Sequence, residues 1–277
     1  MAGVQVHPSA IVAPSAVIGD GSIIGPYCVV GPHVRLGQRC TLHSHVVIEG
    51  FTECGDENQF FPFGSIGLRP QDLKYKGEQS RLVLGNANVI REYVTLQPGT
   101  AGGGMLTHIG DRNLFMANSH LGHDGNVGDA NIIANSCALA GHVTVGSHAV
   151  IGGLCAIHQF VRIGDFAMLG GGAMVERDVP PCGIAQGDRA KLLGVNTIGL
   201  SRNGFAEEEI AQVKRLYREL FFSGQSSFEA RLEAQAARSA PYALVSKIIE
   251  FCRGSSRGIT PSRRMTEEGN GQSQVLD

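Results

Sequence analysis

The chain of 277 residues is 43% hydrophobic and 17% charged, which predicts a globular protein with one large core, or one core and a smaller appendage. Its formal net charge of -2 and the absence of a basic run with interleaved aromatic residues argue against a nucleic-acid-binding protein. The seven cysteines include no Cys-x-x-Cys pair, and no apolar run of about 18 residues or export signal occurs, so we expect a cytoplasmic protein without a disulfide framework, structural zinc or membrane span.

An aliphatic or similar residue recurs at every sixth position over three stretches, from Val6 to Ile66, from Leu84 to Leu96 and from Ile109 to Val175. The stretches hold eleven, three and twelve hexads. Hexapeptide periodicity predicts a parallel β-helix, in which each hexad forms one short strand and turn and three hexads close a triangular coil. The sequence therefore predicts a mainly β protein, a prism of eight to nine coils that is roughly 40 Å tall at about 4.8 Å per coil.

Four cysteines fall four residues after a hexad anchor, in a slot that elsewhere holds alanine or serine: Cys28, Cys40, Cys137 and Cys155. A buried cysteine behaves as a small hydrophobic residue. We interpret these four as fillers of the prism interior and not as catalytic thiols.

The periodicity changes after Val179-Pro180-Pro181, where the hexads stop and helical spacing begins. We expect the β-helix to occupy residues 1–186, with inserted loops near 68–82 and 98–107, and a small C-terminal α-helical domain to occupy 187–259. Its expected helices run over about 206–222, 227–239 and 241–252, and the polar tail 260–277 should be disordered.

Four histidines fall close together along the repeat, namely His120, His123, His142 and His158. Since one coil is 18 residues, Gly141 stacks directly on His123, and Gln159 stacks on Gly141. A single histidine at such a position is usually an exposed turn residue. Four on neighbouring positions of one edge indicate a functional site.

Two chemistries could use these histidines. Zinc needs three nitrogen or sulfur ligands and an open position, and histidines at the subunit interface of a trimeric β-helix can supply them, as in gamma-type carbonic anhydrases. Alternatively, His123 is a general base, Asp124 fixes its tautomer, and the Gly141 N–H stabilises an oxyanion. The second interpretation accounts for more of the residues.

Several motifs resemble those of the UDP-N-acetylglucosamine O-acyltransferase family, and the resemblance extends from about His7 to Ile259. The segments that carry it are His120-Leu121-Gly122-His123-Asp124, Leu139-Ala140-Gly141-His142-Val143, Ile157-His158-Gln159-Phe160, Gln71-Asp72-Leu73-Lys74-Tyr75, Arg91-Glu92-Tyr93-Val94-Thr95 and Asp178-Val179-Pro180-Pro181.

The resemblance implies a left-handed β-helix and a homotrimer with active sites between subunits. It also implies transfer of a 3-hydroxyacyl chain from acyl carrier protein to the 3-hydroxyl of UDP-N-acetylglucosamine, the first step of lipid A biosynthesis. The acyl chain arrives on the phosphopantetheine arm of the carrier, and no bound cofactor or metal is implied. The implied roles are His123 as general base, Asp124 as its orienting partner and Gly141 N–H as oxyanion donor, with direct attack on the thioester.

Further positions match substrate-contacting residues of the family. Positions that contact the sugar nucleotide or the acyl group are matched by Asp72, Lys74, His120, His142, His158 and Gln159. Positions near the nucleotide phosphates, contributed by a neighbouring subunit, are matched by Asn196 and Arg202. Gly171 matches the acyl-chain ruler, the position that sets the length of the acyl chain. Two departures stand near these positions, because Gln97-Pro98 and Arg189 replace a His-Arg pair and a histidine that are common in the family.

Other members of the hexapeptide superfamily remain alternatives. An N-acyltransferase that acts on an amino-sugar nucleotide, using coenzyme A or acyl carrier protein, shares the prism, but the sister enzyme of this pathway carries a domain before its hexads, whereas the repeat here starts at Val6. A gamma-carbonic-anhydrase-like zinc enzyme is the second alternative. A non-catalytic scaffold would not need the histidines.

Overall fold

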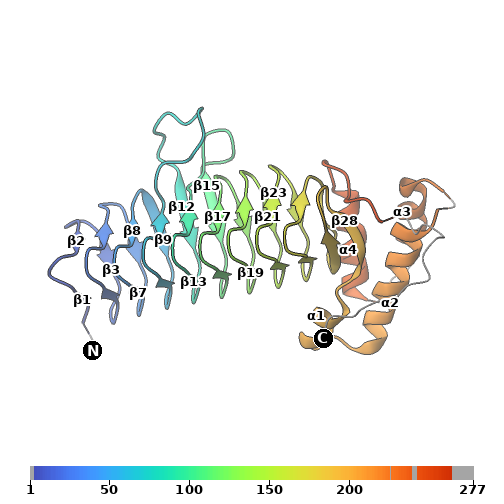
Figure 1. Cartoon of the computed structure of the whole chain (residues 1–277), viewed down its shortest axis with the longest axis horizontal. Helices are drawn as coiled ribbons and strands as arrows, with labels where there is room; N and C mark the ends of the chain where they lie inside the picture. The colour runs from blue at the N-terminus through green and yellow to red at the C-terminus, as the bar shows by residue number, and fades with distance from the viewer. Residues whose placement is uncertain (1–2, 225, 239–241, 264–277) are drawn as a thin grey trace.

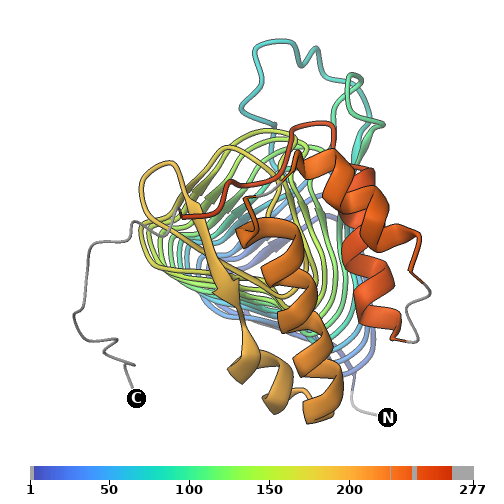
Figure 2. The same ribbon diagram turned by 90° about the vertical axis from the view of Figure 1, so that its right-hand side faces the viewer.

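The structure, a computed structural model, describes residues 3–224, 226–238 and 242–263. Most of the chain winds as a left-handed parallel β-helix with a triangular cross-section, and helices pack at its C-terminal end (Figures 1 and 2). No helix among the described residues is both long and apolar enough to cross a lipid bilayer.

Three parallel sheets form the sides of the prism, because each strand pairs with the strand one coil further along, as Gln5 pairs with Ile23. The first sheet contains β1 (Gln5–Val6), β4 (Ile23–Ile24), β7 (Thr41–Leu42), β10 (Gln59–Phe60), β13 (Val89–Ile90), β16 (Leu114–Phe115), β19 (Ile132–Ile133), β22 (Val150–Ile151) and β25 (Met168–Leu169). The second contains β2 (Ile11–Val12), β5 (Val29–Val30), β8 (Val47–Ile48), β11 (Ser65–Ile66), β14 (Thr95–Leu96), β17 (His120–Leu121), β20 (Ala138–Leu139), β23 (Ala156–Ile157) and β26 (Met174–Val175). The third contains β3 (Val17–Ile18), β6 (Arg35–Leu36), β9 (Phe51–Cys54), β12 (Arg81–Leu84), β15 (Leu106–Ile109), β18 (Asn126–Val127), β21 (Thr144–Val145) and β24 (Arg162–Ile163).

The hexad anchors end these strands and point into the prism. Every anchor from Ile24 to Val175 is buried, whereas Val6 at the open N-terminal end is 47% exposed because no coil covers it. Cys28, Cys40, Cys137 and Cys155 are at most 1% exposed, which confirms that they fill the interior. The hexad periodicity therefore predicted both the fold and its core.

A ladder of asparagines continues the same interior slot. Asn58, Asn88, Asn113 and Asn131 stack on successive coils, and each accepts, at its side-chain oxygen, the backbone N–H of the residue one coil further on. Asn113 donates its N–H and its Nδ2 to Asn88 Oδ1, at 2.9 and 3.1 Å. The ladder thus satisfies buried amides at a corner where the chain turns.

We expect Asn113→Leu to lower the free energy of unfolding by about 2–4 kcal/mol, because the backbone N–H and Nδ2 of Asn131 lose their acceptor inside the protein. Asn126→Ala is the control, since Asn126 is exposed on β18. Urea unfolding at a single protein concentration measures both variants. Equal small losses for the two would show that the ladder contributes little.

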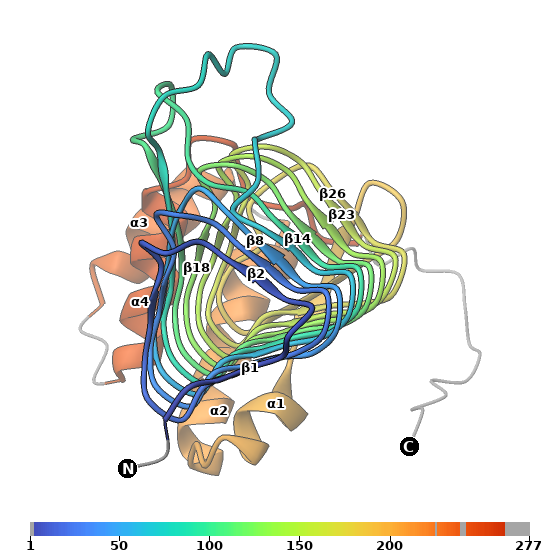
Figure 3. The same ribbon diagram turned by 90° about the vertical axis from the view of Figure 1, so that its left-hand side faces the viewer.

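The triangular coil has three corners. We call the turns from the second sheet to the third the loop corner, those from the third to the first the helix corner, and those from the first to the second the aromatic corner. The inserted segments 67–80, between β11 and β12, and 97–105, between β14 and β15, both leave the prism at the loop corner (Figures 1 and 3).

The part of the chain after the prism differs from the expectation in its first elements. Strand β27 (Gly183–Gln186) pairs with β25, and β28 (Lys191–Val195) pairs antiparallel with β27, so the first sheet continues past residue 187. Helical structure begins only at α1 (Thr197–Arg202) and continues through α2 (Glu207–Tyr217), η1 (Arg218–Phe222), α3 (Phe228–Ala236) and α4 (Ala243–Arg253). The hairpin was not predicted because its strands, of four and five residues, do not follow the six-residue repeat.

The segment that follows α4 corrects another expectation. Residues 260–263 were predicted to be disordered, but Thr260 N–H donates to Asp178 O and Leu192 N–H donates to Pro261 O. The buried Asp178 carboxylate also accepts from Arg162 and Ser255, so it ties the last coil to this segment. The rest of the predicted tail, 264–277, lies outside the described residues.

Candidate active site

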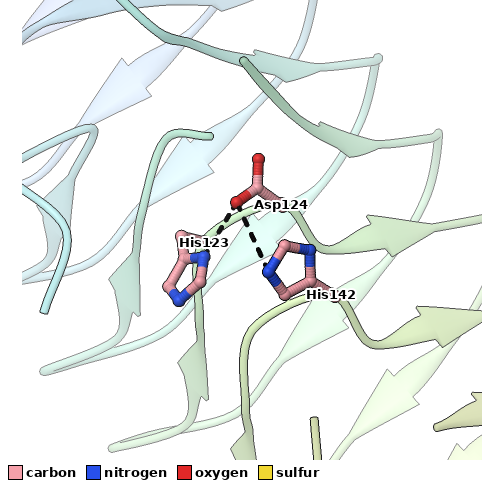
Figure 4. A group of neighbouring side chains, drawn as sticks. All are labelled: His123, Asp124 and His142. Atoms are coloured by element: carbon pink, nitrogen blue, oxygen red, sulfur yellow. Dashed lines mark hydrogen bonds and ion pairs between the residues drawn. The ribbon is translucent and has the colours of Figure 1, made fainter. Parts of the chain in front are cut away.

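The loop corner brings together His123, Asp124 and His142 (Figure 4). His123 and Asp124 follow β17, and His142 follows β20 one coil further on, with His142 N–H donating to His123 O at 2.9 Å. Asp124 and His142 both adopt positive φ, 58° and 61°, because the turn at this corner requires it. The 18-residue coil therefore stacks His142 on Asp124.

His123 and Asp124 form a hydrogen-bonded pair. The His123 Nδ1 lies 2.8 Å from Asp124 Oδ2, and the Asp124 side chain is wholly buried while that of His123 is 11% exposed. An ionised carboxylate only accepts hydrogen bonds, so Nδ1 carries the proton and Nε2 of the neutral imidazole has a free lone pair. This is the arrangement of a general base held in one tautomer.

Gly141 lies against the ring of His123. A Cβ atom at residue 141 would stand 2.6 Å from both Cε1 and Nε2 of His123, so only glycine leaves the imidazole in place. The Gly141 N–H donates to no acceptor among the described residues. A backbone donor next to Nε2 is therefore available to a ligand.

Two more imidazoles surround the pair. His142 packs edge-on against His123, with ring centroids 5.0 Å apart, and stacks on Phe160. Burial lowers the pKa of His142, although Asp124 and Asp72 oppose this, and burial with the neighbouring His123 lowers the pKa of His120. Both rings are thus neutral near pH 7 and can exchange hydrogen bonds with a ligand without adding charge.

The remaining residues predicted for this corner lie around the pair. Asp72 and Lys74 stand on the first inserted loop, where Lys74 N–H donates to Asp72 Oδ1, and their charges act on His142. His158 and Gln159 are exposed on the next coil, and Nδ1 of His158 lies 3.2 Å from Gln159 O.

Asn196 and Arg202 lie away from this group, at the two ends of α1 near the helix corner. Asn196 caps α1, because its Oδ1 accepts from Gly199 N–H and its Nδ2 donates to Phe166 O. Arg202 lines a surface hollow of about 560 Å³ together with Lys214. One chain therefore does not bring these residues to His123.

Gly171 also lies apart from His123, at the aromatic corner. It is exposed, and a Cβ there would meet only Gly153 O, at 3.4 Å. The same corner carries a ladder of stacked rings formed by Tyr27, His45, Phe63 and Tyr93, with centroids about 5 Å apart. The predicted site residues thus occupy all three corners of the prism.

The same group could instead bind a metal ion, because ligand atoms of His123, Asp124 and His142 lie within 4.8 Å of one another. Ligands on a tetrahedral zinc ion stand about 3.3 Å apart, given metal–ligand bonds of roughly 2.0 Å. The 2.8 Å between His123 Nδ1 and Asp124 Oδ2 is shorter and fits a hydrogen bond. The geometry favours a general base.

Two threonines of this corner were not among the predicted site residues. Thr95 Oγ1 lies 2.6 Å from Nδ1 of His120, and Thr100 on the second inserted loop donates to Asp124 from both its N–H and its Oγ1. The spacing of 18 residues could have found neither, because inserted loops interrupt the count between these coils.

Family models match both parts of the chain. The model described as "Udp N-acetylglucosamine O-acyltransferase; Domain 2" matches residues 178–260, and the bacterial transferase hexapeptide model, of six repeats, matches 1–32 and 15–50.

Curated relatives match at greater length. An acyl-(acyl-carrier-protein)–UDP-N-acetylglucosamine O-acyltransferase of Rickettsia bellii is 48% identical over 99% of this chain and 98% of its own. One of Myxococcus xanthus is 50% identical over 76% of this chain and 81% of its own.

Solved structures agree with the sequence matches. A UDP-N-acetylglucosamine O-acyltransferase of Moraxella catarrhalis superposes with a TM-score of 0.89 at 40% identity, covering 92% of this chain and 99% of that one. A UDP-N-acetylglucosamine acyltransferase of Campylobacter jejuni gives 0.89 at 33% identity, with 94% and 100% covered. This chain therefore belongs to the acyl-(acyl-carrier-protein)–UDP-N-acetylglucosamine O-acyltransferase family.

Proposed function

We propose that this protein transfers a 3-hydroxyacyl chain from acyl carrier protein to the 3-hydroxyl of UDP-N-acetylglucosamine, in the cytoplasm, as the first step of lipid A biosynthesis. The observation that carries the proposal is the His123–Asp124 pair beside Gly141, which presents a free imidazole nitrogen next to a free backbone N–H. Family membership supplies the two substrates.

The reaction needs no covalent enzyme intermediate. His123 Nε2 takes the proton of the sugar hydroxyl while that oxygen attacks the thioester carbonyl, and the Gly141 N–H donates to the resulting oxyanion. Collapse of the tetrahedral intermediate breaks the C–S bond. The imidazolium then returns its proton to the departing phosphopantetheine thiolate, so the base is regenerated.

We propose that a homotrimer completes the site. His123, Gly171 and Arg202 lie at different corners of one prism, and in a closed trimer the corner of one chain faces a corner of the next. Tyr27, Phe63 and Tyr93 expose about half of their surface at the aromatic corner, which is the apolar surface that a subunit interface needs.

Within this trimer each chain contributes different contacts. The sugar nucleotide and the acyl group are held at the loop corner by Asp72, Lys74, His120, His142, His158 and Gln159. Arg202 of a neighbouring chain approaches the nucleotide phosphates from α1, the helix that Asn196 caps. The phosphopantetheine arm comes with acyl carrier protein, and the enzyme itself binds no cofactor.

Product analysis tests the function. With 3-hydroxyacyl carrier protein and UDP-N-acetylglucosamine, we expect a product heavier by one acyl group, and mild base should release the acyl group because it is an ester. An acyl group that resists base would indicate an amide and favour the N-acyltransferase. Stoichiometric zinc in the active protein would favour the carbonic-anhydrase-like alternative.

We propose that acyl carrier protein, which is acidic, docks on α2 and the start of η1. Lys214, Arg215 and Arg218 are exposed there, and Arg215 is paired with Glu219 whereas Lys214 and Arg218 have no ion pair among the described residues. Reversing Lys214 and Arg218 to glutamate should raise the KM for the acyl donor about 10-fold or more at low salt, and less at high salt.

The control for this docking surface is reversal of Arg35 and Arg112, which are exposed on the prism. Steady-state kinetics at two ionic strengths measures both double variants. A donor KM that stays unchanged at low salt in the α2 variant would place the carrier elsewhere.

We propose that Gly171 sets the acyl-chain length. Gly171→Met should shift the preferred donor to a chain several methylenes shorter, because each excluded methylene loses about 0.8 kcal/mol of burial. Gly171→Ala should shift it little, since its Cβ meets only Gly153 O. Rates on donors of graded length measure the effect, and an equal loss at every length would show that the substitution only damages the turn that ends in Gly172, whose φ is +71°.

A further inference from the structure

The Asp124 carboxylate is enclosed by one segment that neither the repeat nor the histidines account for. Its Oδ1 accepts from Thr100 N–H at 2.8 Å, and its Oδ2 accepts from Thr100 Oγ1 at 2.6 Å as well as from His123 Nδ1. A single threonine thus supplies a hydrogen bond to each carboxylate oxygen. This two-point contact fixes the plane of the carboxylate.

The second inserted loop is shaped for this contact. Thr100 is 3% exposed, and its carbonyl accepts from the N–H groups of both Gly103 and Met105, which closes the loop on itself. A Cβ at Gly103 would stand 2.0–2.4 Å from the Asp124 carboxylate. The glycine backbone therefore covers the carboxylate closely, and a larger residue there would displace it.

The first inserted loop holds the second. Glu78 Oε1 accepts from Ala101 N–H at 3.0 Å, and Glu78 Oε2 accepts from Lys76 N–H at 2.8 Å. These backbone donors lower the pKa of Glu78, so its carboxylate is charged at neutral pH. The loop that carries Asp72 and Lys74 is thereby joined to the residue next to Thr100.

The position of Asp124 Oδ2 is chemically consequential because two imidazoles compete for it. His123 Nδ1 lies 2.8 Å from this oxygen, and His142 Nε2 lies 3.9 Å from it. If the carboxylate rotated toward His142, the N–H at His123 Nδ1 would lose its hydrogen-bond acceptor. The imidazole would then no longer be held in the tautomer that leaves Nε2 unprotonated.

We infer that Thr100 is a positioning residue, which holds Asp124 on His123 and so keeps His123 in the tautomer of a general base. The inference rests on the proposed role of His123. Because Thr100 is 3% exposed, we expect it to act through Asp124 without touching either substrate, so its loss should lower kcat and leave substrate binding unchanged. Glu78 supports it by fixing the adjoining peptide.

The test compares Thr100→Val, which keeps the backbone N–H and the side-chain shape but removes the hydroxyl, with Thr100→Ser, which restores the hydroxyl. We expect Thr100→Val to lower kcat about 10- to 100-fold with the KM for UDP-N-acetylglucosamine within about twofold, and Thr100→Ser to stay within about threefold of the native protein. Thr41→Val, in β7, is the control, since the Thr41 side chain makes no hydrogen bond among the described residues.

A double-mutant cycle separates positioning from general damage. On an Asp124→Ala background, Thr100→Val should have almost no further effect, because the group through which it acts is gone. An equal fractional loss of kcat on both backgrounds would overturn the inference, and so would a Thr100→Val protein with native kcat. Neither result would count against the proposed function of the enzyme.

A readout without turnover keeps the inference separate from the proposed function. In protein with nitrogen-15-labelled histidine, NMR should detect the proton on His123 Nδ1 in the native and Thr100→Ser proteins and a weakened or shifted signal in Thr100→Val. If the signal is the same in all three, Thr100 does not position the pair, whatever the enzyme catalyses.

Discussion

Replacing His123 by alanine is expected to lower kcat about 100- to 10,000-fold while the protein stays folded, because the substitution removes the base that takes the sugar hydroxyl proton. The side chain is nearly buried but lies at the surface of the prism and not in its aliphatic core, so the melting temperature should change little. Initial rates with saturating substrates, together with thermal melting, measure both effects.

The matched control is His148→Ala. His148 also lies on a turn of the prism and stacks on an aromatic ring, Phe166, but at the helix corner. It should keep nearly native activity. If His123→Ala retains a rate within a factor of three of the native protein, then His123 is not the base.

Gly141→Ala is expected to reduce activity about 100-fold or more, although it adds a single methyl group. The new Cβ would lie 2.6 Å from Nε2 and Cε1 of His123, so the imidazole must swing away from the position in which Nε2 faces the ligand. A side-chain end can move at low cost in stability, so the melting temperature should fall by only a few degrees.

Gly64→Ala serves as the control for this substitution. A Cβ at Gly64 meets Phe61 O at 3.4 Å, an ordinary contact, in a slot that holds alanine on other coils. It should be active. A Gly141→Ala protein with native kcat would show that neither the ring of His123 nor the space above Gly141 takes part in the reaction.

The sequence predicted the prism well because the physics of the repeat is local. Each hexad places its anchor and the residue four positions later inside the prism, and the residue stacked on residue 123 is found by adding 18. The asparagine ladder was also readable, since Asn58, Asn88, Asn113 and Asn131 fall in the same slot as Cys28 and Cys40. It was missed because the slot was interpreted by its small residues alone.

Other features were not predictable from periodicity. Thr100 and Glu78 lie on inserted loops, where no repeat fixes the position of a side chain, and their contacts depend on how the two loops pack. The capping of α1 by the Asn196 amide is another such contact, which periodicity does not predict. Strand β28 was not predicted because the antiparallel hairpin that it forms with β27 lies outside the six-residue repeat.

The central claim is direct transfer of the acyl chain from carrier thiol to sugar hydroxyl, with His123 as the base. Mass spectrometry of a reaction stopped during turnover tests it most directly, because it weighs the enzyme, the carrier and the sugar nucleotide together. We predict one acylated sugar nucleotide for each carrier thiol released, and an enzyme of unchanged mass. An enzyme that carries the acyl group, or carrier thiol released without an acylated sugar nucleotide, would contradict the account.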